Sequence, residues 1–146
     1  MERLCRAFDA WEAVDSSPFQ RRARLLQSIW RSEKGFPMGS LKGTPRGAML
    51  QMPFAEEYLA NFLTPRIQGL VRNEVMDPDR ARGKLYGKPR IFNNLLSSQP
   101  LCFNLFGELA FELDLATAVF SELSGGRIAR VEHIDFEYSP GRGDPR

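Results

Sequence analysis

Residues His133, Asp135 and Glu137 alternate so that three metal-binding side chains would share one face of a strand. The set mixes nitrogen and oxygen donors, which a divalent metal can use. Side chains two residues apart on a strand lie ~6.6 Å apart, so one ion would take two of them at most. The same alternation is typical of the wet face of an edge strand. A metal site would need a further ligand from another element, and Glu108 or Glu112 are the natural candidates.

Glu108 follows residues 91–107, a run of 17 residues without charge in a chain that is 26% charged. Most of the apolar residues in this run are large, but it also holds three Asn, two Ser and one Gln. Buried polar side chains need hydrogen-bond partners, so the run predicts a structured turn that leads into a core helix. A buried carboxylate at Glu108 would need a partner or a metal. On the surface of a helix it would need neither.

Nucleophilic hydrolysis finds little support in the sequence. His133 is the only histidine, and no GxSxG motif frames a serine. The two cysteines, Cys5 and Cys102, fit no metal or redox spacing. Both lie on apolar faces, which predicts buried free thiols in a reducing compartment.

Charge is unevenly distributed although the net charge is only +2. Residues 20–46 hold seven basic residues against one acid, and residues 66–90 hold seven against three. Residues 108–122 hold four acids and no base. Such a division can produce a basic face for phosphates, or it can reflect solvated helix surfaces with no partner.

Helical periodicity dominates the first 124 residues. The spacing predicts a helix over residues 2–14, and Ser17 and Pro18 are typical of an N-cap and first helical residue. The next helix should end at Gly35, with Phe19, Ala23, Leu26, Ile29 and Trp30 on its apolar stripe. Helix returns near Pro53, and Thr64 with Pro65 gives a second start signal. Pro100 marks a third helix start, before a central helix over residues 101–123 that is apolar on nearly all sides.

Two segments depart from the helical period. Residues 35–47 have a glycine at every fourth position and two prolines, which predicts a loop. Residues 133–138 alternate strictly between polar and apolar side chains, which predicts a half-buried strand over residues 131–138. This strand lies within a tail over residues 127–138, which a turn-like end over 139–146 follows. A lone strand leaves its backbone groups unpaired.

The expected fold is therefore mainly α with a small β segment, in a single domain over residues 1–146. No apolar run reaches the ~18 residues of a membrane span, and no signal peptide is evident, so the expected compartment is the cytoplasm. The predicted core comprises Trp11, Phe19, Trp30, Phe54, Phe62, Leu105, Phe106, Phe111, Val119 and Phe136.

Several blocks of the sequence resemble a known family. They are FQRRARLLQSIWRSEKGFPMG, ANFLTPRIQGLVRNEV, NNLLSSQPLCFNLFGEL and the ending FEYSPGRGD. Together they resemble bacterial PD-(D/E)XK restriction-endonuclease-like proteins of the PGN type, over most of the chain. The resemblance implies a restriction-endonuclease-like α/β fold and Mg²⁺-dependent cleavage of DNA.

The family's aspartate and (D/E)-x-K motifs have no match in this sequence, because they lie further towards the C-terminus. We therefore expect the helical N-terminal part of such a fold, truncated after the first core strand, without catalytic competence or bound cofactor of its own. Among the residues present, the resemblance implies that Glu108 is the catalytic and metal-binding glutamate, with Glu112 second.

Two functions remain open at this stage. In the first, the chain is part of a DNA-directed nuclease, with Arg21, Arg22, Arg24, Lys88 and Arg90 on DNA phosphates. In the second, the chain is a complete non-catalytic interaction or regulatory protein. Its open strand over residues 131–138 would then form a homodimer or join a partner's sheet.

Overall fold

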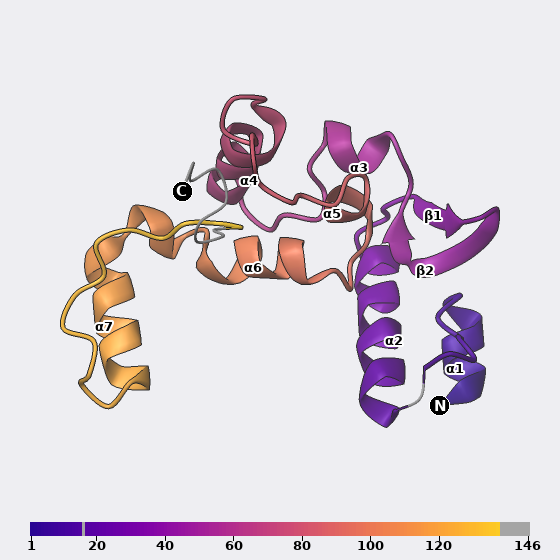
Figure 1. Cartoon of the computed structure of the whole chain (residues 1–146). Helices are drawn as coiled ribbons and strands as arrows, with labels where there is room; N and C mark the ends of the chain where they lie inside the picture. Colours follow the sequence, from indigo (N-terminus) through magenta and orange to yellow (C-terminus); the bar gives the residue numbers. More distant parts are fainter. Residues whose placement is uncertain (16, 138–146) are drawn as a thin grey trace. The chain divides into compact units, whose positions relative to one another are not determined.

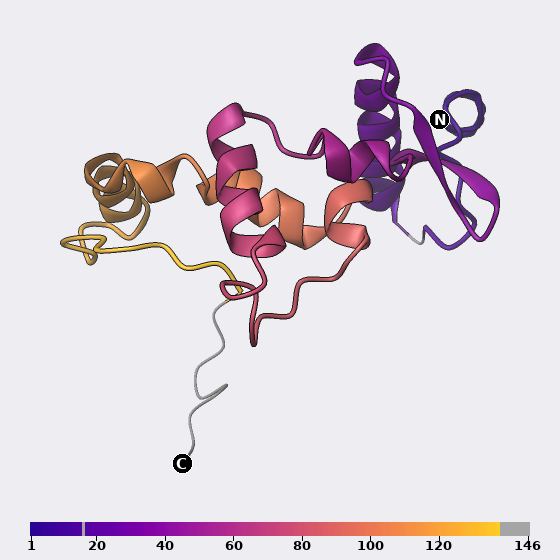
Figure 2. The same ribbon diagram turned by 90° about the horizontal axis from the view of Figure 1, so that it is seen from above.

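The computed structural model describes residues 1–15 and 17–137 (Figures 1 and 2). This part of the chain is mainly helical with one two-stranded antiparallel sheet, which confirms the predicted fold class. In chain order the elements are α1 (Glu2–Ala7), α2 (Pro18–Glu33), β1 (Met38–Leu41), β2 (Thr44–Leu50), α3 (Phe54–Glu57), α4 (Pro65–Val71), the π-helix η1 (Arg72–Met76), α5 (Arg90–Asn93), α6 (Ser98–Phe106), the 3₁₀ helix η2 (Leu109–Phe111) and α7 (Leu113–Leu123).

The chain divides into two compact units, each made of two separate stretches of sequence. Unit 1 comprises Met1–Asn61 and Gly87–Pro100, and unit 2 comprises Phe62–Tyr86 and Leu101–Arg146. In unit 1 the side-chain nitrogen of Asn61 donates to the carbonyls of Ile91 and Asn94, at 3.3 and 3.2 Å. Unit 1 is therefore completed by a stretch that the chain supplies only after an insertion.

Helix α2 begins where the sequence predicts. The Ser17 hydroxyl accepts from the Gln20 amide, and the Gln20 side chain accepts from the Ser17 amide, both at 3.2 Å. This reciprocal capping box satisfies two backbone donors that the helix leaves open, and Pro18 needs no donor. Gly35 ends the helix with a positive φ of 66°, as expected.

The buried face of α2 differs from the predicted stripe. Leu25 and Ser28 are buried, whereas Phe19 is 80% exposed. The reason is a close approach to β2 that only a small side chain allows. Ser28 fits there because its hydroxyl donates to the Arg24 carbonyl at 2.8 Å, so the hydroxyl is buried without losing its hydrogen bond.

A β-hairpin stands where the sequence predicts a loop. Strands β1 and β2 pair with Leu41 opposite Thr44, so the turn consists of Lys42 and Gly43 alone. Both turn residues have positive φ, 50° and 79°, as a type I′ hairpin turn requires. Helix α2 packs against β2 within unit 1 (Figure 1). The prediction of a loop over residues 35–47 is therefore wrong from Met38 onwards.

The glycines of this segment serve close packing of the backbone. A Cβ on Gly39 would lie 2.3 Å from the Leu50 carbonyl oxygen, and one on Gly47 would lie 1.9 Å from the Phe8 carbonyl oxygen. The pairing is irregular between Met38 and Gly39. Glycines at these positions therefore permit strands rather than exclude them.

Helix α1 is shorter than the predicted helix over residues 2–14. It ends at Ala7, and Asp9 takes a positive φ of 51°, which turns the chain back towards α2. Cys5 and Ala10 then bury together with Leu25 of α2. Cys5 is a buried free thiol as predicted, and Cys102 is half-buried.

Unit 2 begins with the predicted cap at Thr64. Its hydroxyl accepts from the Ile67 amide at 3.2 Å, and Pro65 occupies the first position of α4. The buried side of α4 and η1 consists of Ile67, Val71 and Val75, which keep the predicted helical spacing.

The predicted central helix over residues 101–123 is wrong in its continuity and its burial. The chain forms α6, η2 and α7, and it breaks at Gly107 and Glu112. Gly107 is buried. A side chain would not fit there, because a Cβ would lie 2.5 Å from the Phe103 carbonyl oxygen. Leu105 and Phe111 are 57% and 51% exposed, since three short helices cannot all turn their apolar sides inwards.

The predicted strand over residues 131–138 is wrong for residues 131–137, which form no strand, and Tyr138 and the predicted turn-like end lie outside the described residues. The Val131 amide donates to the Thr117 hydroxyl at 2.9 Å instead of to a neighbouring strand. Phe136 buries its ring on Phe103, with centroids 4.2 Å apart and planes 6° apart. Glu137 has a φ of 54°, which no strand adopts.

The aromatic core was predicted in part. Phe62 and Phe136 are buried, and Trp11, Trp30, Phe54, Phe106 and Val119 are half-buried. Phe19, Leu105 and Phe111 are exposed, contrary to the prediction. Among the described residues no helix has the length and apolarity needed to cross a membrane.

Candidate nucleic-acid interface

Arg24, one of the predicted DNA contacts, is held inside unit 1 by Asp15. Its Nε and Nη2 atoms donate to the two carboxylate oxygens of Asp15, each at 2.8 Å. The Asp15 side chain is only 4% exposed. The hydrogen bonds from Arg24 lower the pKa of the Asp15 carboxyl and raise that of the Arg24 guanidinium. This bidentate pair stabilises the approach of the chain to α2 and leaves Arg24 little capacity for an external phosphate.

Replacing Asp15 by asparagine is expected to destabilise unit 1 by about 2–3 kcal/mol at pH 7, because Arg24 would keep a largely desolvated charge. The pKa of Asp15 is lower in the folded chain than its ordinary 3.8. Its contribution is therefore complete above that ordinary value and is lost as the pH falls through the folded pKa. Urea unfolding of the wild type and D15N should differ less at pH 3 than at pH 6.

The matched control is Glu2→Gln, which removes a carboxylate from the exposed pair with Arg6. Its effect should stay below about 0.5 kcal/mol at both pH values. Equal destabilisation by D15N at pH 3 and pH 6 would contradict the assignment of the charge to this pair.

Two further arginines of unit 1 also have internal partners. Arg21 donates from Nε to the Asp15 carbonyl at 3.2 Å and lies 5.6 Å from the centroid of the Trp11 ring. Arg31 donates to the carbonyls of Gly47 and Phe36, both at 2.8 Å, and burial lowers the pKa of its guanidinium. The sequence did not suggest this bracing role for Arg31, because one of its carbonyl partners, Gly47, lies in the unpredicted hairpin.

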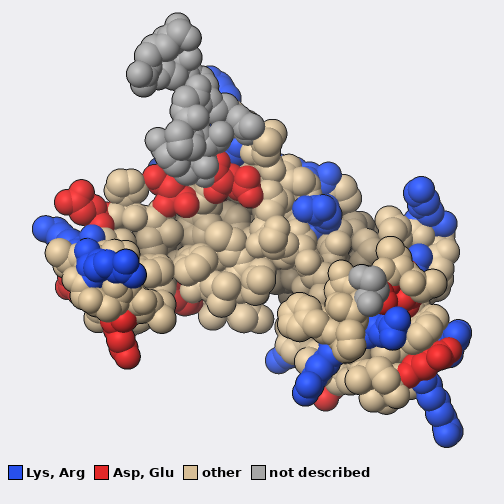
Figure 3. Space-filling view, turned by 60° about the horizontal axis from the view of Figure 1, so that its bottom comes forward, with Lys and Arg blue, Asp and Glu red and all other residues tan. Residues whose placement is uncertain are grey.

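A second group of cations in unit 1 faces solvent. Arg22, Lys42, Lys88 and Arg90 are exposed, and the described residues give them no hydrogen bond or ion pair. Lys42 lies at the tip of the hairpin, and Arg90 is the first residue of α5. On the face shown in Figure 3, the Lys and Arg side chains stand apart, with uncharged and acidic residues between them. They resemble separate contact points more than one continuous basic patch.

The two units differ in charge. Unit 1 contains eleven Lys and Arg against seven Asp and Glu, whereas unit 2 contains nine against eleven. Residues 87–100 of unit 1 contribute Lys88 and Arg90 with no acid at all. An anionic ligand is therefore favoured by unit 1 over unit 2.

Glu108 lies at the break between α6 and η2, with its side chain 42% exposed. It accepts a hydrogen bond from the Thr64 hydroxyl, and its other oxygen lies 3.5 Å from Nη1 of Arg66. Nη1 of Arg66 also donates to Glu112 at 2.9 Å. The two predicted metal-binding glutamates thus share one arginine, and Glu108 supports the cap of α4.

His133 and Asp135 lie together at the surface. Nε2 of His133 is 3.2 Å from Oδ2 of Asp135, and their side chains are 75% and 55% exposed. The predicted strand face with Glu137 is not formed, because residues 131–137 make no strand, so this contact comes from local chain geometry. Among the described residues no group of three His, Cys, Asp or Glu side chains could hold a metal ion.

The comparison with protein families decides the identity of the chain. A family model described as the PD-(D/E)XK nuclease superfamily matches residues 13–146. The chain belongs to this superfamily. Comparison with curated proteins and with solved structures gave no match.

PD-(D/E)XK nucleases are generally metal-dependent. Among the described residues of this family member, Glu108 and Glu112 both pair with Arg66, and no group of three candidate ligands includes them. Glu108 therefore stays a predicted ligand. The exposed basic residues of unit 1 remain the candidate site for an anionic ligand.

Proposed function

We propose that this PD-(D/E)XK family member is DNA-directed and that unit 1 contacts the DNA backbone. The observation that carries the proposal is the set of exposed cations without an internal partner in a nuclease-family chain. These side chains can bind phosphates without the loss of an ion pair inside the protein. Their binding also releases counterions from the DNA. Arg22, Lys88 and Arg90 are the proposed contacts.

The hairpin tip adds a fourth proposed contact. Lys42 and Gly43 form a two-residue turn that projects a narrow two-stranded ribbon. A ribbon of this kind fits the major groove of B-DNA, where Lys42 would reach a phosphate or a base edge. Arg21 and Arg24 take a structural role in this proposal, because Asp15 already holds both.

Metal-assisted cleavage is also part of the proposal, and its dependence on Mg²⁺ rests on family membership. When bound, Mg²⁺ would neutralise charge that develops on the scissile phosphate. Glu108 is the proposed ligand among the described residues, and it would have to exchange Arg66 for the metal. We derive no catalytic step through this ion.

The alternative of a homodimer or partner complex through an open strand is less well supported. Residues 131–137 form no strand, and Phe136 is 3% exposed within unit 2. A partner's sheet would have to extract this ring from its stack on Phe103. The free strand edge that the alternative needs is therefore absent from this part of the described chain.

Removing two of the proposed contacts tests the DNA-binding proposal. The double variant K88A/R90A should weaken binding to duplex DNA at low salt and reduce the slope of log K against log[salt] by about 2, since each lost phosphate contact contributes about 0.9. The measurement is a fluorescence-anisotropy titration of a labelled duplex at several salt concentrations.

The matched control is R80A/R82A in unit 2, which removes the same charge from two exposed residues. Both control arginines pair with nearby carboxylates, so their loss should leave the salt slope close to that of the wild type. An equal change in slope for the two double variants would show that net charge alone, rather than contacts in unit 1, governs binding.

A further inference from the structure

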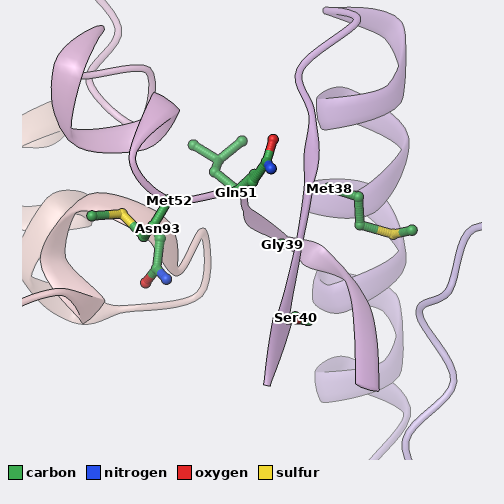
Figure 4. A pocket seen from close by; sticks show the side chains of 7 residues that line it. Met38, Gly39, Ser40, Gln51, Met52 and Asn93 are labelled. Atoms are coloured by element: carbon green, nitrogen blue, oxygen red, sulfur yellow. The ribbon is translucent and has the colours of Figure 1, made fainter. Parts of the chain in front are cut away.

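A polar hollow of about 340 Å³ lies within unit 1, beside the irregular pairing of β1 and β2. Its lining comprises Met38, Gly39, Ser40, Leu50, Gln51, Met52 and Asn93. In Figure 4, Asn93 of α5 and Met52 lie on one side and Gly39 and Ser40 of β1 lie on the other, with Gln51 between them. The volume is at the lower end of the range for small-molecule pockets, about 300–1,000 Å³.

Asn93 is the informative residue of this hollow. It is only 8% exposed, and its side chain makes no hydrogen bond to the described residues. The amide oxygen and nitrogen of Asn93 still reach solvent, although the residue as a whole is buried. The carboxamide can therefore bind a ligand in the hollow without breaking a hydrogen bond to the described residues. A carboxamide offers one donor and one acceptor side by side.

The remaining lining sets the chemistry of the ligand. No charged side chain lines the hollow, so a neutral polar group is favoured over a phosphate or a carboxylate. Gln51 and Ser40 are the other polar residues of the lining, and Met52, beside Asn93, is an apolar and polarizable one. A flat heteroaromatic ring with donors and acceptors on its edge matches this combination.

Two exposed cations, Lys88 and Arg90, precede Asn93 closely in the sequence. Arg90 begins α5 three residues before Asn93, and Lys88 lies two residues further back. Neither has an ion pair or hydrogen bond to the described residues. A neutral hollow followed by free cations fits a nucleotide better than an isolated ring, because the cations can take the phosphates.

We propose that this hollow receives a single unpaired nucleobase of the DNA, with adenine preferred, and that the Asn93 carboxamide reads its edge. The inference rests on the proposed function, since DNA is the source of the base. Asn and Gln pair in bidentate fashion with the N6 and N7 atoms of adenine, which accounts for the preference. An unstacked base is required, because a side chain this deeply buried cannot enter a groove.

The experiment uses three duplexes that differ at one position: fully paired, with an extrahelical adenine, and with an extrahelical abasic site. The wild-type chain should bind the adenine duplex about tenfold more tightly than the abasic duplex. The abasic duplex has the same bulge and flexibility without the base, so the ratio of the two affinities reports the base alone.

Two variants from different elements remove the site. N93L replaces an unpartnered buried amide by an apolar side chain of similar size, and S40F fills the hollow from β1. Both should reduce the tenfold ratio to about one while they keep the affinity for the paired duplex. Urea unfolding should show that N93L folds as the wild type does, because the change removes no hydrogen bond to the described residues. N73L, at an exposed asparagine of η1, is the control and should keep the ratio.

Free 2′-deoxyadenosine, titrated by calorimetry, provides a second probe that needs no duplex and keeps the N6 and N7 atoms of adenine. Equal affinity of the wild type for the adenine and abasic duplexes would overturn the nucleobase site and leave the proposed DNA binding intact. Failure to bind any duplex, combined with nucleoside binding that N93L abolishes, would overturn the proposed function and keep a site for free nucleosides. If neither probe binds, the hollow holds only water and both proposals are overturned.

Discussion

Replacing Gly47 by alanine is expected to destabilise unit 1 by at least about 3 kcal/mol, enough to unfold a marginally stable protein. The added Cβ would lie 1.9 Å from the Phe8 carbonyl oxygen and 2.6 Å from the Ser28 hydroxyl oxygen. A backbone carbonyl cannot rotate away as a flexible side chain can, so the segment after α1 and helix α2 would have to move apart from β2.

Urea unfolding followed by tryptophan fluorescence measures this effect selectively. Trp11 and Trp30 are the only tryptophans, and both belong to unit 1. Gly69→Ala is the matched control, because nothing lies within 4 Å of its Cβ position in α4. That change should stabilise α4 by about 0.5–1 kcal/mol, which far-UV circular dichroism can follow, since both tryptophans lie in unit 1. A G47A variant within 1 kcal/mol of the wild type would contradict the close approach of the Phe8 carbonyl to β2.

Replacing Phe136 by alanine is expected to cost about 3–5 kcal/mol in unit 2, the range for buried aromatic residues. Phe136 is 3% exposed and stacks on Phe103, which is also buried. Removal of the ring leaves a cavity beside Phe103 and releases the segment after α7 from its main anchor. The exposed Arg127 and Arg130 of that segment should then become sensitive to trypsin.

The control for this second change is Phe111→Ala, since Phe111 is 51% exposed. Far-UV circular dichroism should show a loss of about 1 kcal/mol or less for F111A, and trypsin should cleave it no faster than the wild type. If F136A loses no more stability than F111A and resists trypsin equally, Phe136 does not anchor the segment.

Helix starts were predictable from the sequence because their causes are local. Ser17 with Pro18, and Thr64 with Pro65, need only residues up to three positions away to satisfy the first amides of a helix. The hairpin was not predictable in this way, because its glycines are explained by distant backbone. Position 47 needs a glycine because the Phe8 carbonyl would collide with any Cβ there. No periodicity within residues 35–47 reveals that contact.

Burial was harder to predict than helix position. Phe19 belongs to an apolar stripe, but the helix turns the smaller Ser28 towards β2, because the closeness of two backbones outweighs the size of one side chain. Arg24 and Glu108 also differ from their predicted roles because each has a partner inside the protein that is distant in the sequence. The partner of Arg24 is nine residues away, and Thr64 is 44 residues from Glu108.

The exposed cations of the candidate interface were predictable only where no other residue of the chain binds the cation. Arg22, Lys88 and Arg90 are exposed cations in the structure as in the prediction, since nothing in the described chain competes for them. The role proposed for Asn93 depends on three elements, β1, β2 and α5, that meet only in the folded chain. The uncharged run drew attention to its asparagines but could not show which of them lacks a partner.

The interrupted sequence of unit 1 has a consequence for biosynthesis. When residues 1–61 have left the ribosome, the bridge from Met49 to Asn94 and the carbonyls that Asn61 binds do not yet exist. The contacts that complete unit 1 can form only after the intervening residues 62–86 and then residues 87–100 have been made. Joining Asn61 directly to Gly87 would remove that delay, because unit 1 would then be one continuous stretch of the polypeptide.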